Sequence, residues 1–191
     1  MNSKDLIYSD YYKFHSICLI LKSNSCKCNR EIKDIYQYFH LENDIFPDIA
    51  YSVNADCRIT SNPKKHLITK NEEIIYTTDN YSDLLQYLDW YIMNTIISGL
   101  KELYLIHAGV VALGDKGLVF PAESGAGKTT LIMELLKHNF KYLSDEIAPI
   151  DPSTLRVLPF PKGLNVKDGT AIFNGYSIGE TSSVDYIIFP K

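Results

Sequence analysis

A glycine-rich stretch at residues 121–130, Pro-Ala-Glu-Ser-Gly-Ala-Gly-Lys-Thr-Thr, constrains this chain more than any other segment. An apolar run precedes it at residues 117–120, and a run with helical composition follows at residues 131–137. A strand, a glycine-rich loop and a helix in this order predict a phosphate-binding loop. Gly125 and Gly127 can adopt positive φ and bring bare backbone N–H groups close to an anion.

The residues that close this loop have the chemistry that nucleotide phosphates require. The pattern predicts a helix from about Lys128, with its free N–H groups and positive dipole end facing the phosphates. The Lys128 ammonium can reach the β- and γ-phosphates, and the Thr129 hydroxyl can bind Mg²⁺. The full pattern has glycine where this chain has Ala122, a mild departure only if the φ of Ala122 is negative. The expected nucleotide-binding residues are Glu123, Ser124, Gly125, Ala126, Gly127, Lys128, Thr129 and Thr130.

Length, composition and charge narrow the class of protein. The 191 residues suffice for one domain, or for one domain with a small companion, and 46% hydrophobic residues suffice for a core. A net charge of −4 and the lack of a Lys/Arg cluster argue against a nucleic-acid partner. No apolar run has the length of a membrane span, and the N-terminus lacks the apolar core of a signal peptide. We therefore expect a cytoplasmic protein without a membrane partner.

Two parts are expected along the chain. Residues 1–79 predict a small β-rich segment, in which residues 31–40 have helical spacing with a strand as the alternative. Residues 23–30 are polar and turn-like. The expected strands of this part cover residues 14–21, 49–53, 65–69 and 73–77, and the last two form a hairpin across residues 70–72.

Residues 80–191 are expected to form the phosphate-loop domain. Residues 80–97 predict its first helix, capped by Asn80 or Ser82, with Gly99 in the left-handed conformation just past its end. A strand at residues 103–113 and a turn at residues 114–117 lead back into the strand before the loop. Further strands are expected at residues 140–147, 155–158 and 186–189.

Asp145 and Glu146 end an apolar run that lies one helix and one strand after Lys128. If this strand is parallel and adjacent to the strand before the loop, Asp145 would lie beside the γ-phosphate. A carboxylate there can accept a proton from an attacking hydroxyl or bind Mg²⁺. The alternative is a solvated pair of carboxylates at the end of a strand.

These motifs, in this order, resemble the HPr kinase/phosphorylase family. The resemblance rests on residues 106–110, Ile-His-Ala-Gly-Val, on residues 123–129 of the loop, and on residues 144–146, Ser-Asp-Glu. The resemblance covers roughly residues 103–190. Within the family, the chain looks closer to the HPr kinase-like enzymes associated with peptide-modification clusters than to the regulator of sugar uptake. The resemblance implies an α/β fold with a P-loop domain of the HPr kinase and PEP carboxykinase-like kind, after a small N-terminal β-rich segment.

The resemblance also implies roles for single residues. The catalytic residues would be Asp145, which accepts the proton of the acceptor hydroxyl, His107, which lies near that aspartate and tunes it, and Lys128. The Mg²⁺ ligands would be Thr129, Asp145 and Glu146, and Glu146 stands where the family has a second aspartate. His107 could equally be a core histidine whose ring is satisfied by backbone groups.

The implied activity is transfer of a phosphoryl group to a serine-type hydroxyl of a peptide, a protein or a small molecule. ATP is the expected donor, and pyrophosphate or another nucleotide stays open because no base-reading motif is visible. Lys162 is expected near the acceptor site. The C-terminal helices with which HPr kinases bind HPr and form hexamers have no counterpart before Lys191. We therefore expect either a fragment or a short form, and we do not expect HPr as the acceptor, whereas homo-oligomerisation stays open.

Two other functions remain alternatives. A non-catalytic nucleotide-binding or regulatory module is favoured by Ala122, by Glu146 and by the early end of the chain. An ATP hydrolase would carry a further signature, such as Leu-Ser-Gly-Gly-Gln, and a second acidic strand far downstream, and the sequence has neither.

Overall fold

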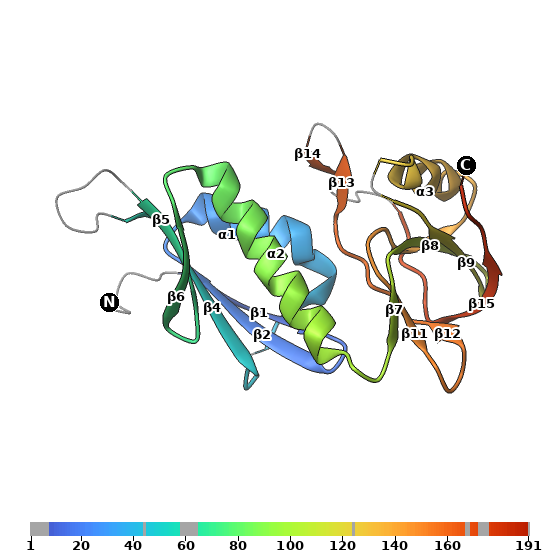
Figure 1. The fold of residues 1–191 in the computed structure, drawn as a ribbon, viewed down its shortest axis with the longest axis horizontal. Coiled ribbons are helices and arrows are strands. Elements are labelled where there is room, and N and C mark those ends of the chain that lie inside the picture. The colour runs from blue at the N-terminus through green and yellow to red at the C-terminus, as the bar shows by residue number, and fades with distance from the viewer. Residues whose placement is uncertain are drawn as a thin grey trace. The chain divides into compact units, whose positions relative to one another are not determined.

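The chain divides into two compact units, Met1–Leu100 and Lys101–Lys191. The computed structural model describes residues 8–43, 45–57, 65–123, 125–166, 169–171 and 176–190. The N-terminal unit combines a β-sheet with α1 and α2, and the described part of the C-terminal unit combines β-sheet with α3, so the expected mixture of α and β structure is confirmed (Figure 1). The expected division at residues 79/80 is wrong in position, because helix α2 (Tyr81–Gly99) contacts strands of the N-terminal unit and belongs to it.

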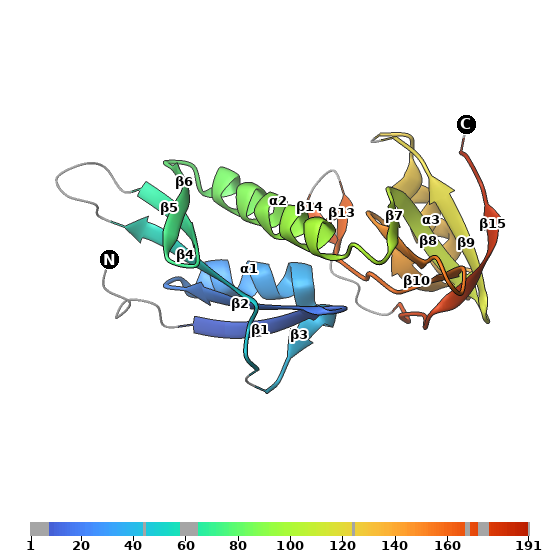
Figure 2. The same cartoon turned by 60° about the horizontal axis from the view of Figure 1, so that its bottom comes forward.

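The N-terminal unit contains a six-stranded sheet with the order β3-β1-β2-β4-β5-β6. Strand β2 runs parallel to β4, and the other neighbours are antiparallel. Helices α1 and α2 lie on the same side of this sheet, where α1 contacts β1 and β2, and α2 contacts β5 and β6 (Figures 1 and 2). The elements are β1 (Tyr8–Phe14), β2 (Ile17–Ser23), α1 (Cys26–Tyr36), the 3₁₀ helix η2 (Gln37–Phe39), β3 (His40–Leu41), β4 (Ile49–Cys57), β5 (Lys65–Lys70), β6 (Glu73–Thr78) and α2.

Of two local expectations in this unit, one is confirmed and one is partly wrong. The β5–β6 hairpin is confirmed, and its two turn residues, Asn71 and Glu72, both have positive φ, as a tight two-residue turn requires. The turn expected at residues 23–30 is wrong in its second half, because the Ser25 side chain accepts a hydrogen bond from the Cys28 N–H and starts α1.

The cap predicted at the start of α2 is confirmed, whereas the cap predicted at its end is wrong. Asn80 caps the helix as expected, because its side chain accepts a 2.9 Å hydrogen bond from the Ser82 N–H. Gly99 is the last helical residue and is not among the described glycines with positive φ, so the predicted left-handed cap is wrong. Its small size matters instead, since a Cβ atom at Gly99 would lie 2.4 Å from Ile17 Cδ1.

The C-terminal unit contains a seven-stranded sheet with the order β10-β8-β9-β15-β12-β11-β7. Strands β8 and β9 form the expected antiparallel hairpin, with Gly114 at φ 63° in its turn. Helix α3 (Lys128–Leu136) follows β9 after the glycine-rich residues, as predicted. The strands are β7 (Tyr104–Ile106), β8 (Ala108–Leu113), β9 (Lys116–Pro121), β10 (Lys141–Ser144), β11 (Ala148–Asp151), β12 (Arg156–Val157), β13 (Leu164–Val166), β14 (Gly169–Ala171) and β15 (Ser182–Ile187), of which β13 and β14 form a separate pair.

The strand expected at residues 103–113 is broken at His107. Strand β7 before it pairs with β11, whereas β8 after it pairs with β9 and β10. The opposite strand is broken at the same level, since β10 ends at Ser144 and β11 starts at Ala148. Ser144 is paired with Val110, and Ala148 with Ile106, so residues 145–147 lie opposite residues 107–109. His107, Asp145 and Glu146 therefore lie at this break.

Helix α3 packs closely on β8. Ile132 and Leu136 of the helix belong to a buried cluster with Val111, Phe120 and Tyr142 from the strands beneath it. A Cβ atom added to Gly109 would come within 3.0 Å of both Ile132 and Lys128, so the glycine permits this close approach. The other face of the sheet carries a second buried cluster, formed by Ala108, Val110, Ala112, Val119, Leu143, Ala148, Ile150 and Val157.

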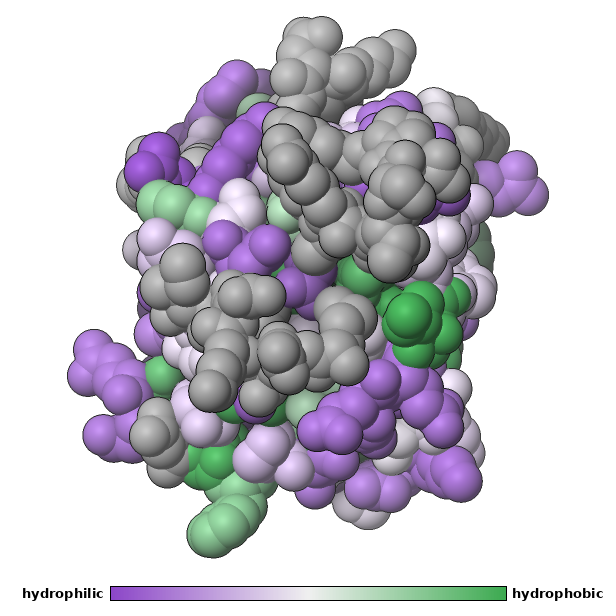
Figure 3. Space-filling view, turned by 90° about the vertical axis from the view of Figure 1, so that its left-hand side faces the viewer, coloured by the Kyte–Doolittle hydropathy of each residue, from purple (hydrophilic) through white to green (hydrophobic). Residues whose placement is uncertain are grey.

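The surface of the described residues contains hydrophilic and hydrophobic side chains in mixture, as Figure 3 shows for one face. Among the helices of the described residues, none has both the length and the apolar character that crossing a membrane requires.

Candidate functional site

The glycine-rich loop between β9 and α3 has the backbone conformation that its sequence predicts. Gly125 and Gly127 have φ of 87° and 82°, and a Cβ atom at either position would meet no atom within 4 Å. Gly127 is the N-cap of α3 and has no side chain with which to cap this helix end. The first N–H groups of α3 therefore have no acceptor from the N-cap residue, and a helix start of this kind attracts anions.

The remaining loop residues are compatible with this reading. Ala122 is absent from the described non-glycine residues with positive φ, so its departure from the glycine pattern is mild. The Ala126 N–H donates a 3.3 Å hydrogen bond to the Glu123 carbonyl and closes a turn within the loop. Glu123, Ala126 and Thr130 are exposed, whereas Ser124 lies outside the described residues.

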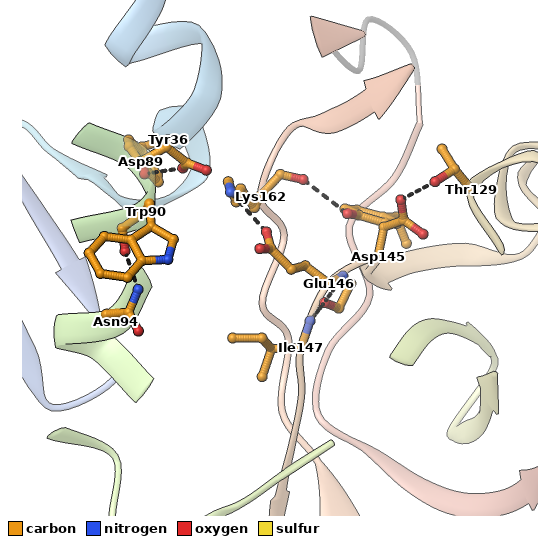
Figure 4. Close-up of polar contacts among 11 residues, drawn as sticks. Tyr36, Asp89, Trp90, Asn94, Thr129, Asp145, Glu146, Ile147 and Lys162 are labelled. Carbon is orange, nitrogen blue, oxygen red and sulfur yellow. Dashed lines mark hydrogen bonds and ion pairs between the residues drawn. The ribbon is translucent and has the colours of Figure 1, made fainter. Parts of the chain in front are cut away.

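A hydrogen bond between Thr129 and Asp145 connects α3 with the acidic residues that follow β10. The Thr129 hydroxyl, in the first turn of α3, donates a 2.6 Å hydrogen bond to Oδ2 of Asp145, which follows β10 (Figure 4). The expected adjacency of β9 and β10 is wrong, because β8 lies between them and is antiparallel to both. The two flanking strands nevertheless run in the same direction, and α3 crosses the intervening strand to bring Thr129 to Asp145.

Lys128 is held at the break in β7–β8. Its side chain is buried, and Nζ lies 2.8 Å from Nε2 of His107 and donates a 3.2 Å hydrogen bond to the Ala122 carbonyl. An ammonium group has only donors, so Nε2 of His107 is the acceptor when Lys128 is protonated. Burial lowers the pKa of Lys128, and the charges of Asp145 and Glu146 oppose this shift.

Asp145 has one oxygen engaged and one without a partner. Oδ1 is buried and has no hydrogen-bond partner among the described residues, whereas Oδ2 accepts from Thr129. Burial raises the pKa of Asp145, and the Thr129 hydrogen bond and the Lys128 charge act in the opposite direction. A buried carboxylate oxygen without a donor is costly unless something else binds it.

Glu146 points away from Asp145. Its Oε2 lies 2.8 Å from Nζ of Lys162, on the bend that follows β12 (Figure 4). The Ser144 hydroxyl accepts hydrogen bonds from the backbone N–H groups of Glu146 and Ile147, at 3.3 Å and 3.2 Å. Sequence reasoning assigned no role to Ser144, although a serine that accepts from the N–H groups two and three residues ahead is a known turn device.

The structure thus brings together most of the predicted site residues. Lys128, Thr129 and Asp145 form one connected group with His107, which contacts the lysine directly. His107 has an electrostatic effect on Asp145 and lowers its pKa, whereas its hydrogen-bond contact is with Lys128. Glu146 is directed to Lys162 and not to Thr129.

A hydroxyl and a carboxylate fit the preferences of Mg²⁺, which binds few protein oxygens and completes its shell with water and phosphate oxygens. The partnerless Oδ1 of Asp145, next to the Thr129 hydroxyl, is the observation that supports this fit. Among the described residues, no three or more His, Cys, Asp or Glu side chains gather closely enough to hold a metal ion by themselves.

Comparison with protein-family models yields no match for this chain, and comparison with curated proteins yields none either. The geometry of the residues must therefore carry the functional argument.

Proposed function

We propose that this chain is an ATP-dependent kinase that resembles the HPr kinase-like enzymes and transfers a phosphoryl group to a serine-type hydroxyl. The observation that carries the proposal is the 2.6 Å hydrogen bond between Thr129 and Asp145. It joins a glycine loop with an uncapped helix start to a buried carboxylate, and phosphoryl transfer needs both.

The glycine loop would bind the phosphates of the donor. The backbone N–H groups after Gly125 and Gly127 and the ammonium of Lys128 provide positive charge where the phosphates carry negative charge. Thr129 and Asp145 would hold Mg²⁺, which supplies charge neutralisation of the phosphate oxygens when bound. Lys128 would exchange its contact with His107 for a phosphate oxygen.

Asp145 would act as the base. The acceptor oxygen forms a bond to the γ-phosphorus as the bond to the leaving ADP oxygen breaks, and the hydroxyl proton passes to a carboxylate oxygen of Asp145. Burial raises the pKa of this carboxyl, which makes it a better proton acceptor than an exposed aspartate. His107 would hold Lys128 in place until the phosphates bind, and it would help to set the charge around Asp145.

The remaining parts of the proposal follow from the resemblance. They comprise a P-loop domain of the HPr kinase and PEP carboxykinase-like kind, a peptide, protein or small-molecule acceptor, and a location in the cytoplasm. A non-catalytic nucleotide-binding module is the second candidate, and the observation that favours it is the engagement of Glu146 with Lys162, which leaves one carboxylate at the loop.

The test is a transfer assay with γ-labelled ATP, Mg²⁺ and a mixture of serine-containing peptides. We expect label on a serine hydroxyl with the unaltered chain and none with Asp145→Asn. Label released only as inorganic phosphate would favour a hydrolase. Binding of ATP without any loss of its γ-phosphate would favour the non-catalytic module.

A further inference from the structure

We propose that Lys162 is a positioning residue that keeps Glu146 turned away from the Thr129–Asp145 pair, so that a single carboxylate faces the glycine loop. The inference rests on the proposed function, because it concerns the charge that the phosphates of the donor meet. It assigns Glu146 to Lys162 and not to the metal.

The backbone of Lys162 is fixed on the strand that leads to Asp145. The Phe160 N–H donates a 2.8 Å hydrogen bond to the Leu143 carbonyl, and the Tyr142 hydroxyl donates a 2.9 Å hydrogen bond to the Lys162 carbonyl. Phe160 and Tyr142 are fully buried. Two neighbouring residues of β10, which ends one residue before Asp145, therefore hold the bend that carries Lys162.

Glu146 is held from both ends. Its backbone N–H donates to the Ser144 hydroxyl, and its carboxylate is paired with Lys162 at 2.8 Å. Asp145 and Glu146 are adjacent in sequence, yet Figure 4 shows their side chains pointing in different directions, one to Thr129 and one to Lys162. Each of the two carboxylates therefore has its own partner, Thr129 for Asp145 and Lys162 for Glu146.

Electrostatics explains why this division matters for a phosphate ligand. If Lys162 lost its charge, Glu146 would become an uncompensated carboxylate beside Asp145 and free to rotate toward the loop. Two unit charges several ångströms apart at a protein surface interact by enough to change an affinity by about tenfold. The phosphates would then bind less tightly.

The same pair is half-buried, with side-chain exposures of 12% for Lys162 and 41% for Glu146, so its loss can also lower the free energy of unfolding. The stability of each variant must therefore be measured beside its affinity. An effect on phosphate binding that exceeds any effect on stability thus separates a positioning role from a merely structural one.

The experiment measures the affinity of the full chain for Mg²⁺–ATP by calorimetry, together with the unfolding midpoint of each variant. We expect Lys162→Met to bind about tenfold more weakly. Lys162→Arg, which keeps the charge, should bind within about twofold of the unaltered chain. The double variant Glu146→Gln with Lys162→Met should recover the original affinity, because it removes both charges.

Lys137 and Glu134 provide a matched control at the other end of α3, where an exposed ion pair has an N–O distance of 2.7 Å. Lys137→Met removes the same charge from the same unit and should leave the affinity unchanged. Equal binding by Lys162→Met and the unaltered chain would overturn this inference alone. Weak binding by Lys162→Met that the double variant with Glu146→Gln does not restore would also overturn it. An unaltered chain that binds no Mg²⁺–ATP overturns the proposed function, and this inference with it.

Discussion

Thr129 donates a 2.6 Å hydrogen bond to Oδ2 of Asp145, although the strands before these two residues are not neighbours in the sheet. The contact exists because α3 lies across β8, where Gly109 leaves room for the helix. It connects the end of the glycine loop to the acidic end of β10. A ligand that replaces the hydrogen bond from Thr129 to Asp145 would therefore contact both the start of α3 and the end of β10.

The first prediction concerns the Thr129 hydroxyl. Thr129→Val keeps the shape of the side chain but removes the donor to Asp145, so we expect a loss of about 0.5–1.5 kcal/mol in the free energy of unfolding. We also expect at least about tenfold weaker Mg²⁺-dependent binding of ATP, because a metal ligand is removed. Denaturant unfolding and calorimetry measure the two effects.

Two variants control this prediction. Thr129→Ser retains the hydroxyl and should retain most of the affinity. Thr130→Val changes the exposed neighbour and should stay within about 0.5 kcal/mol of the unaltered stability. Undiminished Mg²⁺-dependent binding by Thr129→Val would remove Thr129 from the metal site.

The second prediction concerns the packing of α3 on β8 at Gly109. Gly109→Ala places a methyl group 3.0 Å from Ile132 and from Cγ of Lys128, so the helix must shift. Overpacking of this kind lowers the free energy of unfolding by about 1–3 kcal/mol. ATP binding should weaken as well, since Lys128 and the start of α3 move.

The control for this prediction is Gly114→Ala, in the β8–β9 turn, which is strained by its φ of 63° but meets no neighbour. It should lower the stability and leave the affinity as it is, and equal affinities for both variants would contradict the prediction.

The third prediction concerns the pH dependence of stability. Burial raises the pKa of Asp145, so its ionised form is less favourable in the folded chain than in the unfolded one. The loss of folding stability caused by the ionised Asp145 is fully present above the pKa of the folded chain. It disappears as the pH falls through that pKa toward the pKa of the unfolded chain. Asp145→Asn should therefore raise the unfolding midpoint at pH 8, and its advantage should shrink near pH 4.

Asp151 serves as the opposite case for this measurement. Hydrogen bonds from Ser153 lower the pKa of Asp151, so its ionised form is favoured in the folded chain. Its contribution is present above the unfolded pKa and is lost as the pH falls through the folded pKa. Asp151→Asn should thus lower the midpoint at pH 8. Thermal unfolding that shows the same sign for both variants would show that burial of Asp145 is not the cause.

Local signals were sufficient to predict several parts of the fold and the site. Two glycines before Lys128 and an apolar helical run after it predict the loop and the start of α3, because positive φ and helix initiation depend on nearby residues. The cap at Asn80 and the hairpin at Asn71 and Glu72 are local for the same reason.

Other features depend on contacts between distant segments, and sequence patterns do not reveal them. Residues 103–113 form an unbroken strand-like run, and only the change of pairing partner shows that His107 interrupts it. The apolar face of α2 predicts burial, but it does not say against which sheet. The pairing of Glu146 with Lys162 depends on a bend that Tyr142 and Phe160 hold.

The central claim is that the glycine loop binds the phosphates of a nucleotide, and calorimetry with Mg²⁺–ATP tests it most directly. We expect the unaltered chain to bind, and Asp145→Asn still to bind, although more weakly because it loses one of the two proposed Mg²⁺ ligands. Lys128→Ala should lose most of the affinity, because it removes the ammonium that lies between His107 and Ala122. Absence of binding by the unaltered chain, or equal binding by Lys128→Ala, would contradict the claim.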